Sequence, residues 1–357
     1  MEEQHEPALG VIGLGNIARL HCDRLQKAGY DNVVTAGLDV DPDARGRFAA
    51  QYDATVYERQ ADLYADVDAV LVTTPNKFHE EYVVGALEAG LDVFVEKPLA
   101  HTVESAEGIA EAAREAEGFC MVGFHNRFRD PVQVLVSYRD DGTMGELDHI
   151  EANYLRRRGV PGRGSWFTRR ALAGGGALID IGVHAIDLSL YLLDFPEVVE
   201  VSGQTRATFG TRAEYAYVNM WGEDHGSSGF DVDDSASAFI RCADGSTIAL
   251  EVAWASNRPD SQEYVVRGSG AGARLELSDD EMELYETVST GVDHHRTSQI
   301  ETAGEDAHGI ELEKFVESVA TGEPPGTNTV EQALAVQRVL DAIYRSSEEG
   351  RAISLAE

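Results

Sequence analysis

The chain has 357 residues, 43% of them hydrophobic, and this length favours two domains with substantial cores. It carries 63 acidic residues against 29 basic ones, a formal net charge of −34 at pH 7. Nucleic acid and anionic membranes present the same sign of charge, so the composition excludes both as partners. No stretch approaches the roughly 20 apolar residues of a membrane span, and the acidic start of the chain is unlike a signal peptide. We therefore expect a cytoplasmic protein.

The acidic residues are spread along the chain, and only four of the basic residues are lysines. Hyperthermophiles enrich lysine together with glutamate, whereas high salt would screen the repulsion among so many carboxylates. We therefore expect a halophilic protein; arginine-favouring codon bias would explain the scarce lysines but not the carboxylates. The three cysteines are widely spaced, so they predict neither a zinc site nor a disulfide framework, and no metal is expected.

The first third of the chain alternates short apolar strands with helices. Strands are expected at 8–13, 32–38, 68–73, 92–95 and 119–124, and helices at 16–28, 42–52 and 79–89, with one more before the last strand. Such alternation predicts a parallel, doubly wound sheet with helices on its faces. We expect this α/β domain to span residues 1–125.

The pattern changes after residue 125. An apolar helix at 177–193 follows a glycine-rich stretch, and Asp244-Gly245 between two apolar strands is a strong hairpin signal. Further elements are expected as strands at 238–242, 247–252, 264–266 and 274–277 and as helices at 308–320 and 330–347. Residues 126–357 are therefore predicted to form an α+β domain with a large, open and mainly antiparallel sheet.

A glycine motif follows the first strand and opens the first helix. Gly13-Leu14-Gly15-Asn16-Ile17-Ala18 matches G-x-G-x-x-A. The first glycine permits a tight turn, the second lets the backbone approach a pyrophosphate, and the helix N-terminus faces the anion. We therefore predict a dinucleotide-binding Rossmann domain that uses Gly13, Gly15, Asn16 and Ile17. The alternative is a purely structural turn.

Asp39 ends the next strand, at the distance expected for an acid that binds ribose hydroxyls. A carboxylate there repels a 2′-phosphate, and Val40 follows where an NADP enzyme would gain from a cation. These residues favour NAD, while nearby Arg45 keeps NADP as the alternative. A solvated loop acid, one of several with Asp41 and Asp43, is the other interpretation.

Two further segments carry candidate chemistry. Glu96-Lys97-Pro98 ends a strand at the edge where open α/β sheets bind ligands, although a surface lysine in a loop is the simpler interpretation. On the apolar helix, Asp180, His184 and Asp187 are spaced i, i+4, i+7 and share one face. A buried acid–histidine pair suits proton transfer. The alternatives are a core histidine and a pair of metal ligands that lacks a third.

These motifs together resemble the glucose-fructose oxidoreductase/inositol dehydrogenase/rhizopine-catabolism (Gfo/Idh/MocA) family over essentially the whole chain. The resemblance implies a Rossmann domain followed by an α/β domain whose open sheet makes subunit contacts, in a homodimer or homotetramer. It also implies that Lys97, Asp180 and His184 form the catalytic group.

The same resemblance places further residues around the ligands. Glu96 and the segment Thr74-Pro75-Asn76, with His79 after it, match cofactor-lining positions. The segment 123–128 resembles the family's crossing between domains, where Arg127 would meet nicotinamide or substrate.

The segment 154–159 departs from the inositol dehydrogenases, which carry a substrate-binding histidine there. Inositol is therefore disfavoured as the substrate. Arg157 and Trp166 suggest a site for a sugar or an acidic sugar, with a basic surface loop as the alternative.

The sequence thus predicts an NAD-dependent dehydrogenase of a sugar, cyclitol or sugar derivative. His184 would take the hydroxyl proton, Lys97 would stabilise the developing alkoxide, and Asp180 would orient the sugar or the histidine. Two alternatives remain open: an NAD-dependent glycoside hydrolase of the same family, and a non-catalytic sensor that keeps the dinucleotide fold.

Overall fold

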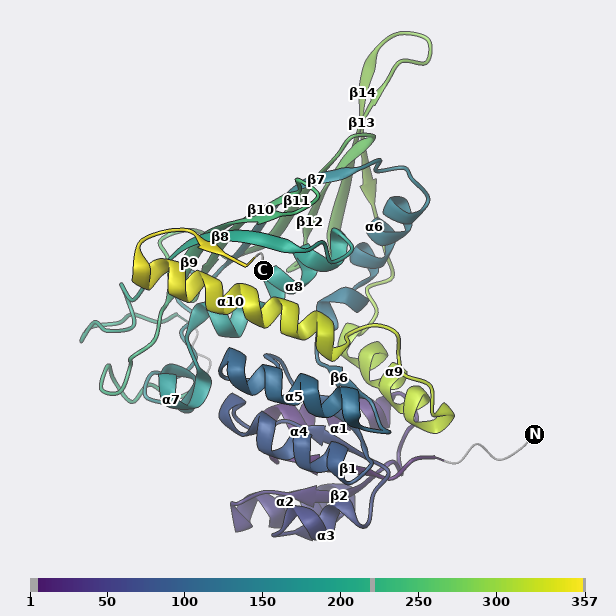
Figure 1. Ribbon diagram of the computed structural model, residues 1–357, viewed down its shortest axis with the longest axis vertical. Coiled ribbons are helices and arrows are strands. Elements are labelled where there is room, and N and C mark those ends of the chain that lie inside the picture. Colours follow the sequence, from purple (N-terminus) through teal and green to yellow (C-terminus); the bar gives the residue numbers. More distant parts are fainter. Residues whose placement is uncertain (1–5, 219–221, 356–357) are drawn as a thin grey trace. The chain divides into compact units, whose positions relative to one another are not determined.

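The structure is a computed structural model that describes residues 6–218 and 222–355 (Figure 1). Its residues separate into two compact units. The first contains the chain up to His125 together with Asp306–Gln337, and the second contains Asn126–Glu305 and the chain from Arg338 onward. The sequence prediction placed everything after residue 125 in the second domain, whereas the structure returns residues 306–337 to the first.

The first unit is built on a parallel sheet of six strands in the order β3-β2-β1-β4-β5-β6. Its strands are β1 (Leu9–Ile12), β2 (Val34–Leu38), β3 (Thr55–Tyr57), β4 (Ala69–Val72), β5 (Asp92–Val95) and β6 (Cys120–Val122). Its helices are α1 (Asn16–Lys27), α2 (Pro42–Tyr52), α3 (Gln60–Tyr64), α4 (His79–Glu88), α5 (Val103–Glu115) and α9 (Ala307–Thr321). The strands other than the edge strand β3 are largely buried and apolar, and helical crossovers join the strands of the sheet. The predicted doubly wound α/β sheet is therefore confirmed.

The strand order reverses between β1 and β4, since β2 and β3 lie to one side of β1 and β5 and β6 lie beyond β4. At the carboxyl end of β1, Ile12 lies opposite Leu38 of β2 and Val72 of β4. Open α/β sheets bind their ligands at such a switch point, outside the carboxyl ends of the strands. The glycine turn after Ile12 and the threonine pair after Val72 both lie at this point.

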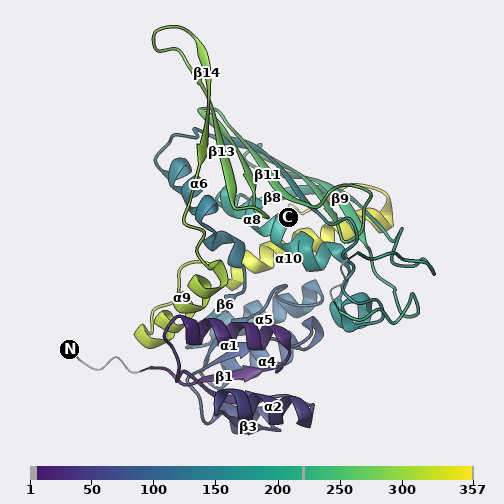
Figure 2. The same ribbon diagram turned by 180° about the vertical axis from the view of Figure 1, so that it is seen from behind.

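Helix α9 lies with α1 on one face of this sheet, while α4 and α5 lie on the other (Figures 1 and 2). Phe315 of α9 is fully buried, and its ring lies 5.6 Å from that of Phe94 and 5.9 Å from that of Phe119. Without α9, these aromatic side chains of the sheet would face water. This apolar contact explains why residues 306–337 belong to the first unit.

The second unit is built on a sheet of nine strands in the order β14-β13-β12-β11-β7-β10-β9-β8-β15. Its pairs are antiparallel except for β10 with β7. The strands are β7 (Leu147–Leu155), β8 (Val198–Arg206), β9 (Ser235–Cys242), β10 (Thr247–Ala253), β11 (Ser261–Gly268), β12 (Ala271–Glu276), β13 (Glu281–Val288), β14 (His294–Ile300) and β15 (Ile353–Ser354). The predicted large and mainly antiparallel sheet is confirmed, including the hairpin at Asp244-Gly245.

Helices cover one face of this sheet, and in the described part of the chain none covers the other (Figures 1 and 2). The helices of this unit are α6 (Asp130–Asp140), α7 (Arg170–Ala173), α8 (Val183–Leu192) and the later part of α10 (Val330–Glu349). Side chains alternate accordingly along β9, where Ile240 is fully buried and its neighbour Phe239 is 45% exposed. The sheet is therefore open on one side, as predicted.

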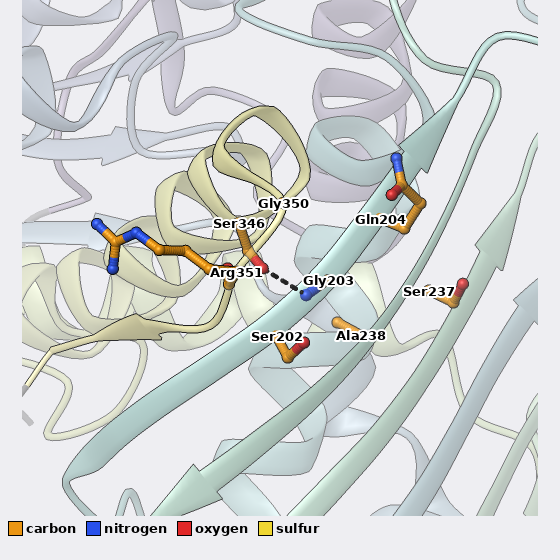
Figure 3. A pocket seen from close by; sticks show the side chains of 8 residues that line it. All are labelled: Ser202, Gly203, Gln204, Ser237, Ala238, Ser346, Gly350 and Arg351. Atoms are coloured by element: carbon orange, nitrogen blue, oxygen red, sulfur yellow. Dashed lines mark hydrogen bonds between the residues drawn. The ribbon is translucent and has the colours of Figure 1, made fainter.

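The β8 edge of the sheet is closed by the C-terminal part of the chain. β15 pairs with β8 at Val201, and beyond it the backbone N–H groups of Gly203 and Thr205 donate to the hydroxyls of Ser346 and Ser347 at 2.9 and 3.0 Å. Figure 3 shows Ser346 reaching Gly203 across the groove between α10 and β8. Hydroxyl groups thus take the place of a further strand along this edge.

The segment Arg170–Leu192 is long and apolar enough to cross a membrane, by length and composition alone. The expectation that no such stretch exists is therefore corrected. In the structure, 78% of its apolar window is buried inside the protein. Its side chains pack beneath the sheet, where Gly182 lies close to Val252 of β10. This segment is the core helix of the second unit, and its apolar composition follows from that burial.

Candidate active site

The glycine turn between β1 and α1 leaves its backbone open. Gly13 has a φ of +88°, and a Cβ there would lie 2.9 Å from the backbone nitrogen of Thr74, so the position requires glycine. A Cβ on Gly15 would meet nothing within 4 Å, and Gly15 is exposed. Asn16 and Ile17 form the first turn of α1. An exposed helix N-terminus behind an open turn suits an anionic pyrophosphate.

The carboxylate of Asp39 ties this turn to the end of β2. One of its oxygens accepts the backbone N–H of Leu14 at 2.7 Å, and the other accepts a backbone N–H two residues further on at 2.8 Å. Arg45 donates to the carbonyl oxygen of Asp39 at 2.8 Å and pairs with Glu58 at 2.6 Å. Val40 is 88% exposed. The guanidinium of Arg45 thus contacts a backbone carbonyl oxygen and Glu58, and the Asp39 carboxylate accepts backbone N–H groups. This arrangement agrees with the prediction that Asp39 favours NAD.

The loops after β4 and β5 are joined by His79. Its ring is fully buried, with Nδ1 2.9 Å from the carbonyl oxygen of Pro98 and Nε2 3.0 Å from that of Thr74. Burial lowers the pKa of His79 despite these two carbonyl contacts. His79 therefore holds the two loops together from beneath. Asn76, also predicted to line the cofactor, is buried in the short helical turn that precedes α4.

The segment Glu96-Lys97-Pro98 lies at the end of β5, and its Lys97–Pro98 peptide bond is cis. Lys97 is half-buried. The carboxylate of Glu96 is 2.6 Å from Nε2 of His21, a fully buried residue of α1. Burial raises the pKa of Glu96, but the hydrogen bond and charge of His21, followed by the charges of Lys97 and His308, lower it to about 2. Glu96 is therefore an anion over the whole physiological pH range.

These features fit a nicotinamide dinucleotide. Gly15 offers an unobstructed backbone, Asp39 offers a carboxylate, and Oγ1 of Thr74 is buried without a hydrogen-bond partner among the described residues. A buried hydroxyl that lacks a partner is a group for which a ligand can provide one. All three lie at the switch point of the parallel sheet.

In the second unit, the glycines at 175 and 176 are required because two other segments lie against them. A Cβ on Gly175 would lie 2.0 Å from the hydroxyl of Tyr344, and one on Gly176 would lie 1.8 Å from the backbone oxygen of Asp233. The buried Asp233 carboxylate accepts the N–H groups of Gly176 and Leu178 at 2.8 Å each, and also the Tyr344 hydroxyl at 2.8 Å. Asp233 therefore fixes the start of the helical segment that carries the catalytic candidates.

Asp180 and His184 follow this turn on one continuous helical segment. Leu178–Gly182 is a π-helical turn, and α8 continues from it. Oδ2 of Asp180 accepts the indole N–H of Trp254 at 2.9 Å, and Trp254 is fully buried. His184 is 6% exposed. A single wide turn of this kind is frequent at functional sites because it changes the direction of its side chains.

Arg156, at the end of β7, also lies near Asp180. Its guanidinium donates to the Tyr154 hydroxyl at 3.3 Å and lies 5.4 Å from the centre of that ring. Burial lowers the pKa of Arg156, but Tyr154 and Asp180 outweigh burial and raise it above its usual value. Arg156 thus brings a permanent positive charge to the surroundings of Asp180.

Asp187 has a partner other than the catalytic candidates. Its carboxylate forms a two-pronged ion pair with Arg127, at 3.1 Å to Nε and 2.6 Å to Nη2, and both side chains are 1% exposed. The rings of Tyr191 and Phe195 each lie 4.9 Å from the guanidinium. The prediction that Arg127 meets cofactor or substrate therefore competes with a structural role, in which it neutralises a buried acid.

Arg157 and Trp166, two of the substrate candidates from the sequence, differ in exposure. Arg157 is exposed, and its guanidinium donates to the carbonyl oxygen of Arg258 at 3.3 Å. Trp166 is half-buried and stacks on Phe167, with ring centres 3.8 Å apart. Arg156 is the arginine of this segment that lies near Asp180.

Sequence reasoning missed four residues that support the site: His21, Arg156, Asp233 and Trp254. His21 is placed on α1 directly after the glycine motif, which is a signal that could have been used. Asp233 and Trp254 act on Gly176 and Asp180 from 57 and 74 residues away. No local sequence pattern predicts contacts between residues that far apart in the chain.

Two family models match the chain. Residues 8–124 match the model described as "Oxidoreductase family, NAD-binding Rossmann fold", and residues 132–274 match the "GFO/IDH/MocA C-terminal domain". The chain belongs to the Gfo/Idh/MocA oxidoreductase family. It is an NAD(P)-dependent oxidoreductase of the kind that acts on CH–OH groups, as the resemblance implied.

Several members of this family are similar over nearly the whole chain. D-glucoside 3-dehydrogenase of Escherichia coli is 32% identical, with 97% of each chain covered. An inositol 2-dehydrogenase of Gluconacetobacter diazotrophicus is 27% identical, with 96% of this chain and 94% of that one covered. Levoglucosan dehydrogenase, solved in complex with NADH and L-sorbose, has the same fold, with a TM-score of 0.85, 22% identity and 98% of each chain covered.

Proposed function

We propose that this protein oxidises a hydroxyl group of a sugar, a cyclitol or a sugar derivative such as a glycoside. The observation that carries the proposal is the presence of Lys97, Asp180 and His184 at their motif positions in a chain 32% identical to a D-glucoside 3-dehydrogenase. Neither a sensor nor a purely structural domain needs a lysine, an acid and a histidine together at these positions.

Each of the three residues has a part in the reaction. NAD, when bound, accepts the hydride from the carbon that carries the hydroxyl group. His184, in an apolar surrounding, takes the hydroxyl proton. Lys97, at the end of β5, stabilises the negative charge that develops on the oxygen. Asp180, held by the indole of Trp254, orients the substrate or the histidine.

The surroundings of Asp180 suggest how the substrate is bound. A carboxylate accepts hydrogen bonds and a guanidinium donates them, so Asp180 and Arg156 together can bind neighbouring hydroxyl groups of a sugar ring. We therefore add Arg156 to the proposed substrate contacts, ahead of Arg157. Trp166 offers an aromatic face for the ring carbons.

The test is a screen of NAD reduction by the purified full-length protein in molar KCl. The panel contains methyl glucosides, levoglucosan, inositols and sugar acids, and NADH formation is followed by absorbance. We expect stoichiometric NADH with at least one neutral sugar derivative. Cleavage of a glycoside without net NADH would indicate the glycoside hydrolase alternative. NAD binding without turnover of any panel member would favour the sensor.

We also propose that copies of the chain associate through the open face of the nine-stranded sheet. No helix among the described residues covers this face, and Phe239 and Tyr285 are 45% and 37% exposed in the structure. Light scattering after size-exclusion chromatography tests this. A dimer or tetramer that Phe239→Lys reduces to a monomer is the expected result.

A further inference from the structure

One buried histidine has no part in the proposed reaction. His21 lies on α1, is fully buried, and points Nε2 at Oε1 of Glu96 over 2.6 Å. Its other ring nitrogen, Nδ1, is buried and has no hydrogen-bond partner among the described residues. Burying an imidazole nitrogen that has no hydrogen-bond partner lowers the stability of the fold, because the nitrogen loses its contact with water. The contact with Glu96 is therefore the interaction that keeps this residue in place.

His21 is one of three histidines that lie close together in the first unit. The ring of His308, at the start of α9, is 6.3 Å from that of His21 and stacks on His125 at 3.6 Å. Burial, followed by the charge of Arg24, lowers the pKa of His308 to about 4, so His308 is neutral at physiological pH. His21 is thus the histidine that hydrogen-bonds Glu96.

The hydrogen bond between His21 and Glu96 does not depend on the charge of the imidazole. A neutral ring can donate its Nε2–H to the carboxylate, and a protonated ring donates the same hydrogen. The carboxylate is therefore directed by a fixed donor on α1, the helix whose N-terminus begins at the glycine turn. Two parts of the cofactor edge, the glycine turn and the end of β5, are joined through this one contact.

We propose that His21 is a positioning residue for the cofactor. Its hydrogen bond orients the Glu96 carboxylate and keeps it charged, so that it can accept a hydrogen bond at the edge of the sheet where NAD binds. This inference rests on the proposed placement of Glu96 beside the cofactor. His21 itself touches neither cofactor nor substrate. Its effect on NAD binding passes entirely through the Glu96 carboxylate.

The proposal has a consequence that a merely structural histidine would not produce. Burial is the largest influence on the pKa of Glu96 and acts to raise it, while His21 is the strongest influence that lowers it. Removing His21 therefore moves this pKa upward from about 2, toward or beyond the ordinary value of 4.5. The carboxyl group then gains a proton as the pH falls, and NAD affinity falls with it, by up to tenfold per pH unit below the new pKa.

Other titratable groups near this contact come from several elements. Lys97 follows Glu96 on the same loop, His79 of α4 is close enough for its pKa to be influenced by Glu96, and Asp306 and Arg24 face His308. Substitution of His21 also removes one of the charges that lower the pKa of His308. A pH dependence that appears when His21 is replaced is therefore assigned to the His21–Glu96 pair when it disappears in the double variant His21→Leu with Glu96→Gln.

The experiment measures the dissociation constant of NADH for the full-length protein by fluorescence titration between pH 4 and pH 8.5. His21→Leu removes the donor, and His21→Gln keeps an N–H near the position of Nε2. His149→Leu removes a histidine of the second unit as the matched control. We expect a nearly flat affinity for the wild type, His21→Gln and His149→Leu. For His21→Leu we expect the affinity to fall with decreasing pH, by about fourfold at pH 4 relative to pH 8.5 when the pKa of Glu96 reaches its ordinary value of 4.5, and by more when it exceeds that value.

Two outcomes overturn the inference separately from the proposed function. Glu96→Gln with unchanged NADH affinity would show that Glu96 does not serve the cofactor, which overturns the expectation that it lines the cofactor site. In the second outcome, Glu96→Gln weakens NADH affinity, but the His21→Leu protein folds and its affinity does not change with pH. That combination would overturn only the role of His21. If His21→Leu does not fold, the wild type still decides: an affinity that falls tenfold between pH 7 and pH 5 contradicts the proposal.

Discussion

The two units of this protein hold their candidate site residues by different kinds of contact. In the first unit, neighbouring strand ends fix one another: Asp39 holds the glycine turn, and His79 links two loops through their carbonyl oxygens. In the second, buried side chains distant in sequence do so, with Asp233 and Trp254 holding the segment that carries Asp180. A parallel sheet brings its functional loops to one edge through its topology alone, whereas an antiparallel unit must build its site from tertiary contacts.

The largest effects are expected from substitutions of one catalytic candidate in each unit, which show whether the two units contribute equally to catalysis. We expect His184→Asn and Lys97→Met each to lower kcat by roughly 10²–10⁴, with little change in NAD affinity, because both remove a group that acts in proton transfer or charge stabilisation. Steady-state kinetics on the substrate found by the screen measures this. A folded His184→Asn protein with near wild-type turnover would exclude the histidine as the general base, and Lys97 would become the first candidate.

A second prediction concerns how strongly each unit depends on its buried acid. We expect Asp233→Ala to destabilise the second unit by about 3 kcal/mol or more, since it leaves two buried N–H groups and one hydroxyl without a partner. Tyr344→Phe removes only the hydroxyl from this set and should cost about 1 kcal/mol. Asp39→Ala, at a half-buried position, should cost less than Asp233→Ala. Urea unfolding provides the measurement, and equal losses for Asp39→Ala and Asp233→Ala would contradict the comparison between the units.

The third prediction exploits the local character of the first unit. Because Asp39 lies on one strand end with Val40 exposed beside it, Asp39→Ser combined with Val40→Arg should shift the preference from NAD toward NADP more than tenfold in relative kcat/KM. The loss of a charged hydrogen bond, worth about 1.5–3 kcal/mol, accounts for this magnitude. A wild-type enzyme that already uses NADP better would show that Asp39 does not select the cofactor.

The smallest expected effect per residue is the stabilisation of the protein by salt. We expect salt to stabilise both units. A formal net charge of −34 implies mutual repulsion among surface carboxylates, which salt screens. The midpoint of thermal unfolding should therefore rise from low salt to molar KCl, by roughly 2–4 °C for each kcal/mol of repulsion relieved in a unit of this size. Calorimetry at several KCl concentrations tests this. A flat or falling midpoint speaks against adaptation to salt.

Much of the first unit could be predicted because its signals are local. Pro42–Tyr52 and Asp92–Val95 form the helix and strand that the sequence indicated, and the glycine motif lies in the expected turn. The segment that the prediction misplaced is 306–337, since its membership depends on Phe315 contacting aromatic residues some 200 positions earlier. Amphipathic periodicity shows that a helix has an apolar face but not which sheet receives it.

The candidate site was predictable to a smaller extent. The motif residues lie on the elements expected for them, but the widened turn at Leu178–Gly182 interrupts the α-helical spacing that placed Asp180, His184 and Asp187 on one face. Asp187 is instead paired with Arg127. In the run of three arginines, the sequence could not distinguish Arg156 from its neighbours, because only the end of β7 and its pairing with β10 determine which side chain lies near Asp180.

The return of α9 to the first unit has a consequence for how the protein is made. A chain leaves the ribosome from its N-terminus, and domains generally begin to fold in that order. Here the strands β1 to β6 emerge early, but the aromatic surface formed by Phe94 and Phe119 stays open until residues 306–337 arrive. The second unit is by then almost completely synthesised. The cofactor-binding unit therefore begins to fold first and completes its fold among the last, and until then its open aromatic surface is a site at which aggregation can begin.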